Sequence, residues 1–373
     1  QTPDTYRMEE CSLRLPQRYG WIGVDVGTHT VKLAQTVRDG GRVRLHRAAV
    51  IQRPTSWSGD DGLALEQPIT SYPEIRAAIE CGDFEGRNAI SALPMNACQL
   101  RSLNVPPGSD QERRTIIADE LAEDWAELRN PMEFDFWETE PGKTEKGTDS
   151  FNVNVLATSR LWISQVWRDC RKSGLDCWAI DGLPLAMART VGLAGGLTGG
   201  KRALVVDWGY SNTTLCIAGD ERPLYSRRIH DCAFGKVLDA ITSELDVTVD
   251  ETQHLVEQDG VVAPGAAPGA DPEAAKAITS AASGTLDELV RQLSRTLQFT
   301  EMQRRHLQPT TVWLLGGGAS MKNIGPYLAE ALSLPVHVWT LESEAAPIEC
   351  AAGNRAAVFG SAAALSSLVW RAA

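Results

Sequence analysis

Long apolar runs separated by short polar segments dominate residues 20–52, a pattern typical of β-strands. The first run, WIGVDVG, carries one carboxylate, Asp25, and ends at Gly27. Three small or polar residues follow, and then two more apolar runs, THTVKLAQTV and RVRLHRAAVI. The pair Asp39-Gly40 between these two runs is a strong hairpin signal. We therefore predict an antiparallel three-stranded meander with Asp25 beside its first bend.

Between residues 94 and 180 strand-like and helix-like segments alternate. A strand is predicted at Leu100–Val105, and Ser109 and Glu112 form a capping box that opens a helix. Two further strands, FDFWETE and FNVNVLATS, precede a helix at 160–173. This span is predicted to be a compact inserted α+β subdomain.

The pattern of the first meander recurs at Ala203–Ile217, where a strand again leads through Asp-x-Gly into polar residues and a return strand. Recurrence within one chain is stronger evidence than either copy alone. The segment 259–272, rich in Pro, Gly and Ala, is predicted to be a flexible, exposed linker. Leucines at helical spacing from Leu286 predict an amphipathic helix through about Leu307. A buried strand ending at Gly316, a helix, a strand and a closing helix follow.

The composition is that of an ordinary globular protein, with 43% hydrophobic and 23% charged residues. A formal net charge of −12 argues against a general nucleic-acid groove and against a polybasic membrane patch. The 8 cysteines form no C-x-x-C pair, so we expect reduced thiols in the cytoplasm. No run approaches the roughly 20 apolar residues of a membrane-spanning helix. Residues 1–19 are expected to be a flexible arm without a signal-peptide core.

Two facing Asp-x-Gly bends can enclose a polyphosphate. Asp25 and Asp207 end their strands, and their hard carboxylate oxygens suit Mg²⁺, often through water. Gly27 and Gly209 let the backbone approach a phosphate oxygen, and Lys32 is placed to reach a β- or γ-phosphate. Further N–H and hydroxyl donors are expected from the other residues of the bends, which are Thr28, His29, Thr30, Ser211, Asn212 and Thr213. For one bend alone a capped hairpin without a ligand is the simpler interpretation, whereas two bends favour a phosphate site.

The third candidate element is LLGGGASM, in which a buried strand ends in three glycines and a helix begins. Gly316, Gly317 and Gly318 would let a flat ligand such as adenine or ribose approach the backbone. A tight strand–helix turn is the alternative. The position of LLGGGASM, after the second bend and a helical segment, favours the interpretation as a ligand contact.

The order and spacing of these three elements resemble the actin-like ATPase superfamily. In that comparison DVGTHT is similar to the first phosphate loop, DWGYSNTTL to the second, and LLGGGASM to the adenosine motif. Within the superfamily the chain most resembles the PilM-like proteins of type IV pilus assembly, through ISALPM, LRSLNVPPGSDQE, SGLDCWAIDGLPLAMAR and LLGGGASMKNIGPYLAEALSLPVHVW. FtsA-like cell-division proteins come next. The resemblance implies an α/β, two-lobed actin-like (ribonuclease H-like) ATPase fold with an inserted α+β subdomain.

The resemblance also implies a division of the chain. After the arm at 1–19 come a first lobe, an insertion and a second lobe. The second lobe contains a helical subdomain. Their expected bounds are 20–93 with 181–200 and 341–373 for the first lobe, 94–180 for the insertion, 201–340 for the second lobe and 231–310 for the helical subdomain.

The function implied by the resemblance is that of an ATP-binding scaffold with Mg²⁺. Its partner would be the cytoplasmic segment of an inner-membrane pilus or type II secretion protein, so it would be peripheral at the inner membrane. An assembly ATPase and self-association are further expected contacts. Leu183, after Gly182, stands where relatives tend to carry an acidic residue, so weak or absent hydrolysis is expected. Gln253 and Val256 stand in place of a Glu-x-x-Lys type contact beside the adenine.

Three alternatives stay open. A small-molecule kinase of the same superfamily needs a catalytic aspartate facing an acceptor pocket, and no residue of the insertion stands out as one. An FtsA-like protein should end in a basic, apolar membrane-tethering helix, whereas this chain ends in SAAALSSLVWRAA. The third alternative keeps the fold without the nucleotide.

Overall fold

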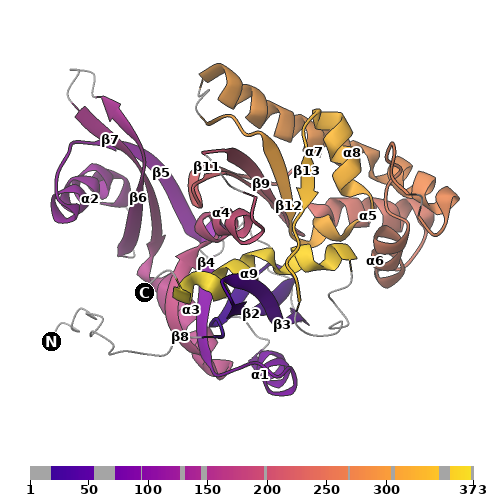
Figure 1. The fold of residues 1–373 in the computed structure, drawn as a ribbon, viewed down its shortest axis with the longest axis horizontal. Coiled ribbons are helices and arrows are strands. Elements are labelled where there is room, and N and C mark those ends of the chain that lie inside the picture. The colour runs from indigo at the N-terminus through magenta and orange to yellow at the C-terminus, as the bar shows by residue number, and fades with distance from the viewer. Residues whose placement is uncertain are drawn as a thin grey trace.

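The computed structural model describes nine stretches of the chain, and the predicted arm at 1–19 lies almost wholly outside them. They are residues 18–53, 72–93, 95–126, 131–143, 149–196, 200–267, 269–303, 307–343 and 353–370. Figure 1 shows two α/β lobes side by side, with a smaller sheet of the insertion at the edge of the molecule. No helix within the described stretches has the length and apolar character needed to cross a membrane.

The first lobe is built on a five-stranded sheet. Its strands, in order across the sheet, are β3 (Arg42–Gln52), β2 (Thr30–Asp39), β1 (Ile22–Val26), β4 (Asn88–Leu93) and β8 (Asp176–Gly182). The predicted meander is confirmed, because β1 pairs with β2 and β2 with β3 in antiparallel register. β4 and β8 extend the sheet in parallel.

The second lobe repeats this topology. Its strands are β11 (Arg222–Ile229), β10 (Thr213–Gly219), β9 (Arg202–Trp208), β12 (Thr311–Leu315) and β13 (Val336–Val338), in the same order. β9, β10 and β11 are antiparallel, and β12 and β13 are parallel. The internal repeat predicted from the two Asp-x-Gly motifs is therefore a repeat of whole sheets.

Two helices join the sheets. α9 (Gly360–Ser366) packs on β1, β2 and β4, whereas α4 (Leu183–Leu193) packs on β9, β10 and β11, and the two helices contact each other. The approach of α9 to the first sheet is very close, because a Cβ added at Gly23 would lie 1.9 Å from the carbonyl oxygen of Ala362. Glycine at this position lets the C-terminal helix close over β1.

The insertion is smaller than predicted. Its sheet has the order β5 (Cys98–Val105), β7 (Asp149–Ser159) and β6 (Met132–Lys143), with α2 (Asp110–Ala126) packed on β5. β8, which the sequence placed inside the insertion, is instead the edge strand of the first sheet, and α3 (Arg160–Lys172) packs on β4 and β8. The pattern of β8 alone does not say which sheet it joins.

The insertion also contacts the second lobe. The Trp137 indole N–H and the Asn154 amide both donate to the carbonyl oxygen of Pro223, at 2.7 and 3.2 Å. Pro223 lies in β11, at the edge of the second sheet. The insertion therefore bridges from the first lobe, where it is rooted, to the second.

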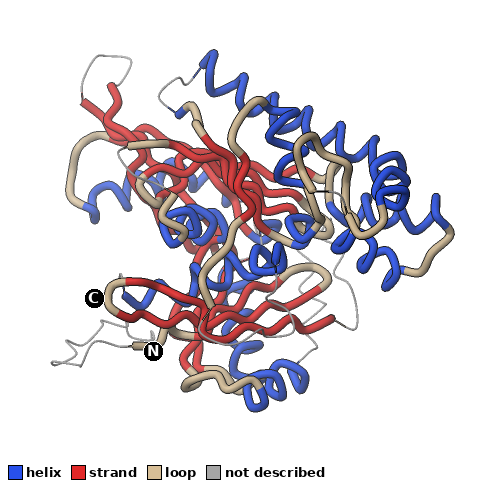
Figure 2. Tube along the Cα trace, turned by 45° about the vertical axis from the view of Figure 1, so that its right-hand side comes forward, coloured by secondary structure: helices blue, strands red, loops and turns tan. Residues whose placement is uncertain are grey.

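The remaining helices cover the two lobes. They are α1 (Tyr72–Cys81) in the first lobe and α5 (Phe234–Leu245), α6 (Val249–Gln258), α7 (Pro272–Gln303) and α8 (Ile324–Leu332) in the second. α7 begins fourteen residues before Leu286, where the leucine pattern made its helix recognisable. Figure 2 shows the helices of the second lobe gathered on one side of its sheet, away from the first lobe's α1.

The predicted flexible linker at 259–272 is wrong for its first part. Val261 is fully buried, and its N–H donates to the Lys322 carbonyl oxygen at 3.1 Å. The Asp259 carboxylate is also buried and accepts from the N–H of Asp271 at 2.6 Å. These contacts hold the segment against the second lobe, and its Pro, Gly and Ala content gave no sign of them.

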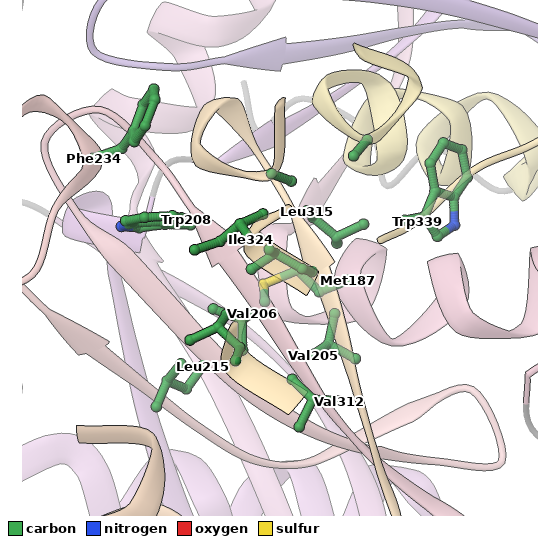
Figure 3. Packing of buried hydrophobic residues seen from close by; sticks show 14 of the residues in the cluster. Met187, Val205, Val206, Trp208, Leu215, Phe234, Val312, Leu315, Ile324 and Trp339 are labelled. Carbon is green, nitrogen blue, oxygen red and sulfur yellow. The ribbon is translucent and has the colours of Figure 1, made fainter. Parts of the chain in front are cut away.

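The largest core lies in the second lobe and reaches into the contact between the lobes. Figure 3 shows Trp208, Trp339 and Met187 packed among the aliphatic side chains of β9 and β12. Trp208 and Trp339 are fully buried, and their indole N–H groups donate to the carbonyl oxygens of Cys232 and Thr190. Buried indoles require such acceptors, so both rings are fixed in place.

Candidate functional site

The two Asp-x-Gly bends have the same local geometry. The N–H of Gly27 donates to the Thr30 carbonyl oxygen, and the N–H of Gly209 donates to that of Asn212, both at 2.9 Å. A Cβ at either glycine would meet that carbonyl oxygen at about 3 Å, so both bends need a residue without a side chain.

The strand register makes the two bends equivalent residue by residue. Asp25 is paired across the strands with Lys32, and Asp207 with Thr214. Lys32 therefore has its counterpart in Thr214, and the site has one lysine for two aspartates.

The bends face each other across the lobes. The hydroxyl oxygens of Thr28 and Ser211, 183 residues apart in the sequence, lie 2.8 Å from each other. The rings of His29 and Tyr210 stack, with centroids 4.1 Å apart and planes at 12°. The sequence could predict two bends but not their contact, which depends on how α4 and α9 join the sheets.

Lys32 is paired with Asp25 and is also attracted by the charge of Asp207. Its Nζ is 3.1 Å from Asp25 Oδ2, and both side chains are largely buried. Burial acts to lower the pKa of Lys32, but the negative charges of Asp25 and Asp207 outweigh it, so the pKa is raised and the ammonium stays charged. For Asp207, burial and the charge of Asp25 outweigh Lys32 and raise the pKa to about 6.

A cavity of about 540 Å³ opens beside these groups, between the lobes. Most of the predicted site residues line it, namely Asp25, Gly27, Thr28, His29, Thr30, Lys32, Asp207, Gly209, Ser211, Asn212 and Gly317. Val249, Asp250, Gln253 and Glu257 of α6 form another wall, and their spacing places them on one face of the helix. Val256, which the sequence paired with Gln253, is instead buried in the core.

The three glycines have different roles. A Cβ at Gly316 would lie 2.3 Å from Asp207 Oδ1, and one at Gly318 would lie 2.2 Å from the Trp208 ring. These two glycines let the turn pack against β9, and neither lines the cavity. Only Gly317 faces it, where a Cβ would have room.

Thr213 does not point into the cavity. It is fully buried, and its hydroxyl donates to the Cys232 carbonyl oxygen at 3.1 Å. Successive side chains of a strand point to opposite faces, so Thr214 lines the cavity in its place. The hydroxyl predicted for phosphate contact at Thr213 therefore has a structural role, as part of the fold that holds the second bend.

Several residues of the site were missed from the sequence. Arg53 Nη1 donates to the carbonyl oxygens of Gly27 and Thr28, at 2.9 and 3.3 Å, and holds the first bend from behind. The N–H groups of Phe234 and Gly235 do the same for the second bend, by donating to Gly209 and Tyr210 at 2.9 and 2.8 Å. These carbonyl oxygens are thus engaged by the protein. No motif identified Arg53, because it lies at the end of a neighbouring strand.

An ion pair lies at the edge of the α6 wall of the cavity. Arg355 Nε donates to Glu257 Oε2 at 3.0 Å, and both residues line the cavity. Arg355 lies in the turn Gly353–Phe359, and Glu257 lies near the end of α6. The pair therefore joins the C-terminal segment to the helical subdomain at the cavity edge.

The donor set fits a phosphate-bound Mg²⁺. No group of three or more His, Cys, Asp or Glu side chains gathers within the described stretches. Mg²⁺ is held in proteins by one or two carboxylates together with waters and substrate phosphates, which is what Asp25 and Asp207 can offer. A buried acceptor without a partner, Asn212 Oδ1, adds an oxygen at the second bend.

No protein-family model and no curated protein matches the sequence. Among solved structures, a chain of the PilM–PilN type IV pilus biogenesis complex is 21% identical with a TM-score of 0.67, over 94% of this chain and 98% of that one. The ethanolamine utilization protein EutJ from Carboxydothermus hydrogenoformans is 12% identical with a TM-score of 0.51, over 94% and 90%. Ta0583, an archaeal actin homologue in complex with ADP, is 13% identical with a TM-score of 0.46, over 94% and 99%. The chain has the actin-like ATPase fold, and its likeness to PilM agrees with the sequence motifs.

Proposed function

We propose that this protein is a nucleotide-binding scaffold that takes ATP with Mg²⁺ in the cavity between its lobes. The observation that carries the proposal is the convergence of both Asp-x-Gly bends and Lys32 on one cavity. A polyphosphate needs backbone donors close by and a charge screen, and bends of this type provide the first.

Each element of the site has a part in this binding. Gly27 and Gly209 let the N–H groups of the bends approach the phosphates, and the Lys32 ammonium neutralises part of their charge. Asp25 and Asp207 would hold the ion, which screens the remaining phosphate charge when it is bound. Gly317 and the face of α6 that carries Gln253 line the part of the cavity that remains for the nucleoside.

Weak or absent hydrolysis is part of the proposal. Leu183 lines the cavity where an acidic side chain could activate water. The neighbouring carboxylate, Asp181, is engaged in an ion pair with Arg189 on α4. A general base must reach the water that it activates, and neither residue meets this need.

The nucleotide proposal is tested by thermal unfolding with and without ATP·Mg²⁺. A ligand at 100 times its Kd adds about 2.7 kcal/mol to the free energy of unfolding, so the wild type should melt several degrees higher. Lys32→Met should lose this shift, because two carboxylates then face the phosphates without the ammonium. Lys201→Met, at an exposed position, is the matched control and should keep it. An unchanged shift in Lys32→Met would place the nucleotide elsewhere.

We further propose that the scaffold serves a type IV pilus or type II secretion assembly. Support comes from the motifs shared with PilM-like proteins and from the TM-score of 0.67 to a chain of the PilM–PilN complex. The partner is the cytoplasmic segment of an inner-membrane protein, which would bring this protein to that membrane. An assembly ATPase and self-association are further contacts within this proposal.

A pull-down with an immobilised peptide from such a segment tests the partner. Retention should rise when ATP·Mg²⁺ is added, because a ligand that binds both lobes favours their closed arrangement. Lys32→Met should show no such rise, and a scrambled peptide should retain neither protein. Equal retention on both peptides would contradict the proposed partner.

A further inference from the structure

One residue, Arg53, supports the backbone of the first bend. Its guanidinium Nη1 donates to the carbonyl oxygens of Gly27 and Thr28, at 2.9 and 3.3 Å. Its backbone N–H donates to the carbonyl oxygen of His29 at 3.0 Å. Arg53 is only 7% exposed and does not line the cavity, whereas the three bend residues do. Three successive carbonyl oxygens of the bend are therefore bound from the side away from the cavity.

These bonds fix the direction in which the N–H groups of the first bend point. The C=O and N–H groups of one trans peptide unit point in opposite directions. The carbonyl oxygens of Gly27 and Thr28 point to Arg53. The N–H groups in the same peptide units, those of Thr28 and His29, therefore point away from Arg53, on the side of the cavity that both residues line. Successive backbone N–H groups of this kind form a concavity that binds anions.

The second bend has the same arrangement with a different support. Two backbone N–H groups at the start of α5 donate to the carbonyl oxygens of Gly209 and Tyr210, at 2.9 and 2.8 Å. The N–H groups of Tyr210 and Ser211 are turned to the cavity in the same way. The first bend is thus supported by a side chain, which a substitution can remove, whereas the second bend is supported by backbone.

We propose that Arg53 is a positioning residue for nucleotide binding, which holds the N–H groups of the first bend toward the cavity without touching the nucleotide. This inference rests on the proposed nucleotide site. Burial lowers the pKa of Arg53, but an arginine stays protonated at neutral pH even so. Hydrogen bonds from a charged donor are stronger than those between neutral groups, so one guanidinium can hold the bend.

Without the guanidinium, two carbonyl oxygens of the first bend lose their donor. A buried acceptor without a partner is destabilising, so the bend would move toward other orientations. Gly27 makes such a rotation easy, because glycine has more backbone freedom than any other residue. A rotated peptide unit turns its carbonyl oxygen to the cavity in place of its N–H, and that oxygen repels an anionic ligand.

Titration calorimetry with ATP·Mg²⁺ tests the inference. Arg53→Met keeps a long side chain and removes its donors, so it should weaken binding by about 10- to 100-fold, the worth of a hydrogen bond from a charged group. Arg53→Lys keeps the charge but not the planar fork, and its affinity should lie between those of the wild type and Arg53→Met. Arg47→Met makes the same change on β3, at a residue that does not line the cavity, and should bind as the wild type does.

Amide resonances of the nucleotide-free protein separate positioning from a general structural role. In Arg53→Met the resonances of Thr28 and His29 should shift or broaden. Those of Phe234 and Gly235, which support the second bend, should keep their wild-type positions. Lost affinity with unchanged resonances of the first bend would assign the effect to charge alone and would overturn the inference.

Wild-type affinity in Arg53→Met would also overturn the inference, and the proposed function would stand. If Arg53→Met does not fold, wild-type affinity and wild-type bend resonances in Arg53→Lys would have the same meaning. A wild type that does not bind ATP·Mg²⁺ would overturn the proposed function as well.

Discussion

Asp207→Asn is expected to stabilise the nucleotide-free protein at pH 7 to 8 and, at the same time, to abolish the gain in melting temperature on ATP·Mg²⁺. The carboxylate has a pKa of about 6 in the fold, against a usual value of 3.8, chiefly because it is buried. Holding it ionised in the folded state therefore costs on the order of 2–3 kcal/mol above pH 6. Asparagine removes that penalty but also removes one of the two carboxylates that we propose to hold the ion.

The pH dependence of the free energy of unfolding follows from the same shift in the pKa of Asp207. Between about pH 4 and pH 6 the folded state holds the Asp207 proton more tightly than the unfolded state, so this group's contribution to stability falls as the pH rises. The stability difference between Asp207→Asn and the wild type should thus be small at pH 4 and reach its full size above pH 6. Thermal unfolding across this range, without nucleotide, measures it.

Asp231→Asn is the matched control for this experiment. Its carboxylate is on the same lobe, highly exposed and paired only loosely with Lys236 at 3.9 Å. It should change the melting temperature by no more than about a degree. Its response to ATP·Mg²⁺ should be that of the wild type. A wild-type melting shift retained in Asp207→Asn would show that this carboxylate has no part in binding.

Trp208→Ala is expected to destabilise the protein by about 3–5 kcal/mol, as for other fully buried large side chains. The ring packs edge-on against Phe234, with centroids 5.2 Å apart, and lies directly against the backbone of Gly318. Its loss leaves a cavity between β9, the glycine turn and α5. Urea unfolding should show a lower midpoint, and nucleotide affinity should fall too, because Asp207 precedes Trp208 on the same strand.

Trp208→Phe separates packing from hydrogen bonding. It keeps a six-membered ring in the core, and it loses the five-membered ring with the N–H that donates to the Cys232 carbonyl oxygen at 2.7 Å. Thr213 also donates to that oxygen, so no acceptor is left unsatisfied. This variant should lose much less stability than Trp208→Ala. Equal losses in the two would assign the effect to the hydrogen bond.

Much of the site could be predicted from the sequence because it depends on local chemistry. The alternation of apolar and polar residues set the strands, and Asp-x-Gly set both bends, since only glycine tolerates the nearby carbonyl oxygen. The recurrence at Asp207 then predicted the internal repeat, which the matching strand orders confirm. Asp25 and Lys32 were predicted in this way, and both line the cavity.

Other features depend on which surfaces meet, and no local pattern records that. The pattern of β8 fits either neighbouring sheet, and β8 joins the first. Val261 lies in a segment that the sequence predicted to be an exposed linker, but it is fully buried. Gly316 and Gly318 looked like ligand contacts, but they serve the packing against β9.

The sequence by itself determined the two Asp-x-Gly bends, the glycines that they need and the lysine that follows the first of them. The tertiary structure alone decided that the bends face each other, that Lys32 is attracted by the carboxylates of both lobes, and that Thr28 touches Ser211. The physical reason is that a bend is fixed by the residues within it, whereas the distance between two bends is fixed by the packing of α4 and α9 between the sheets.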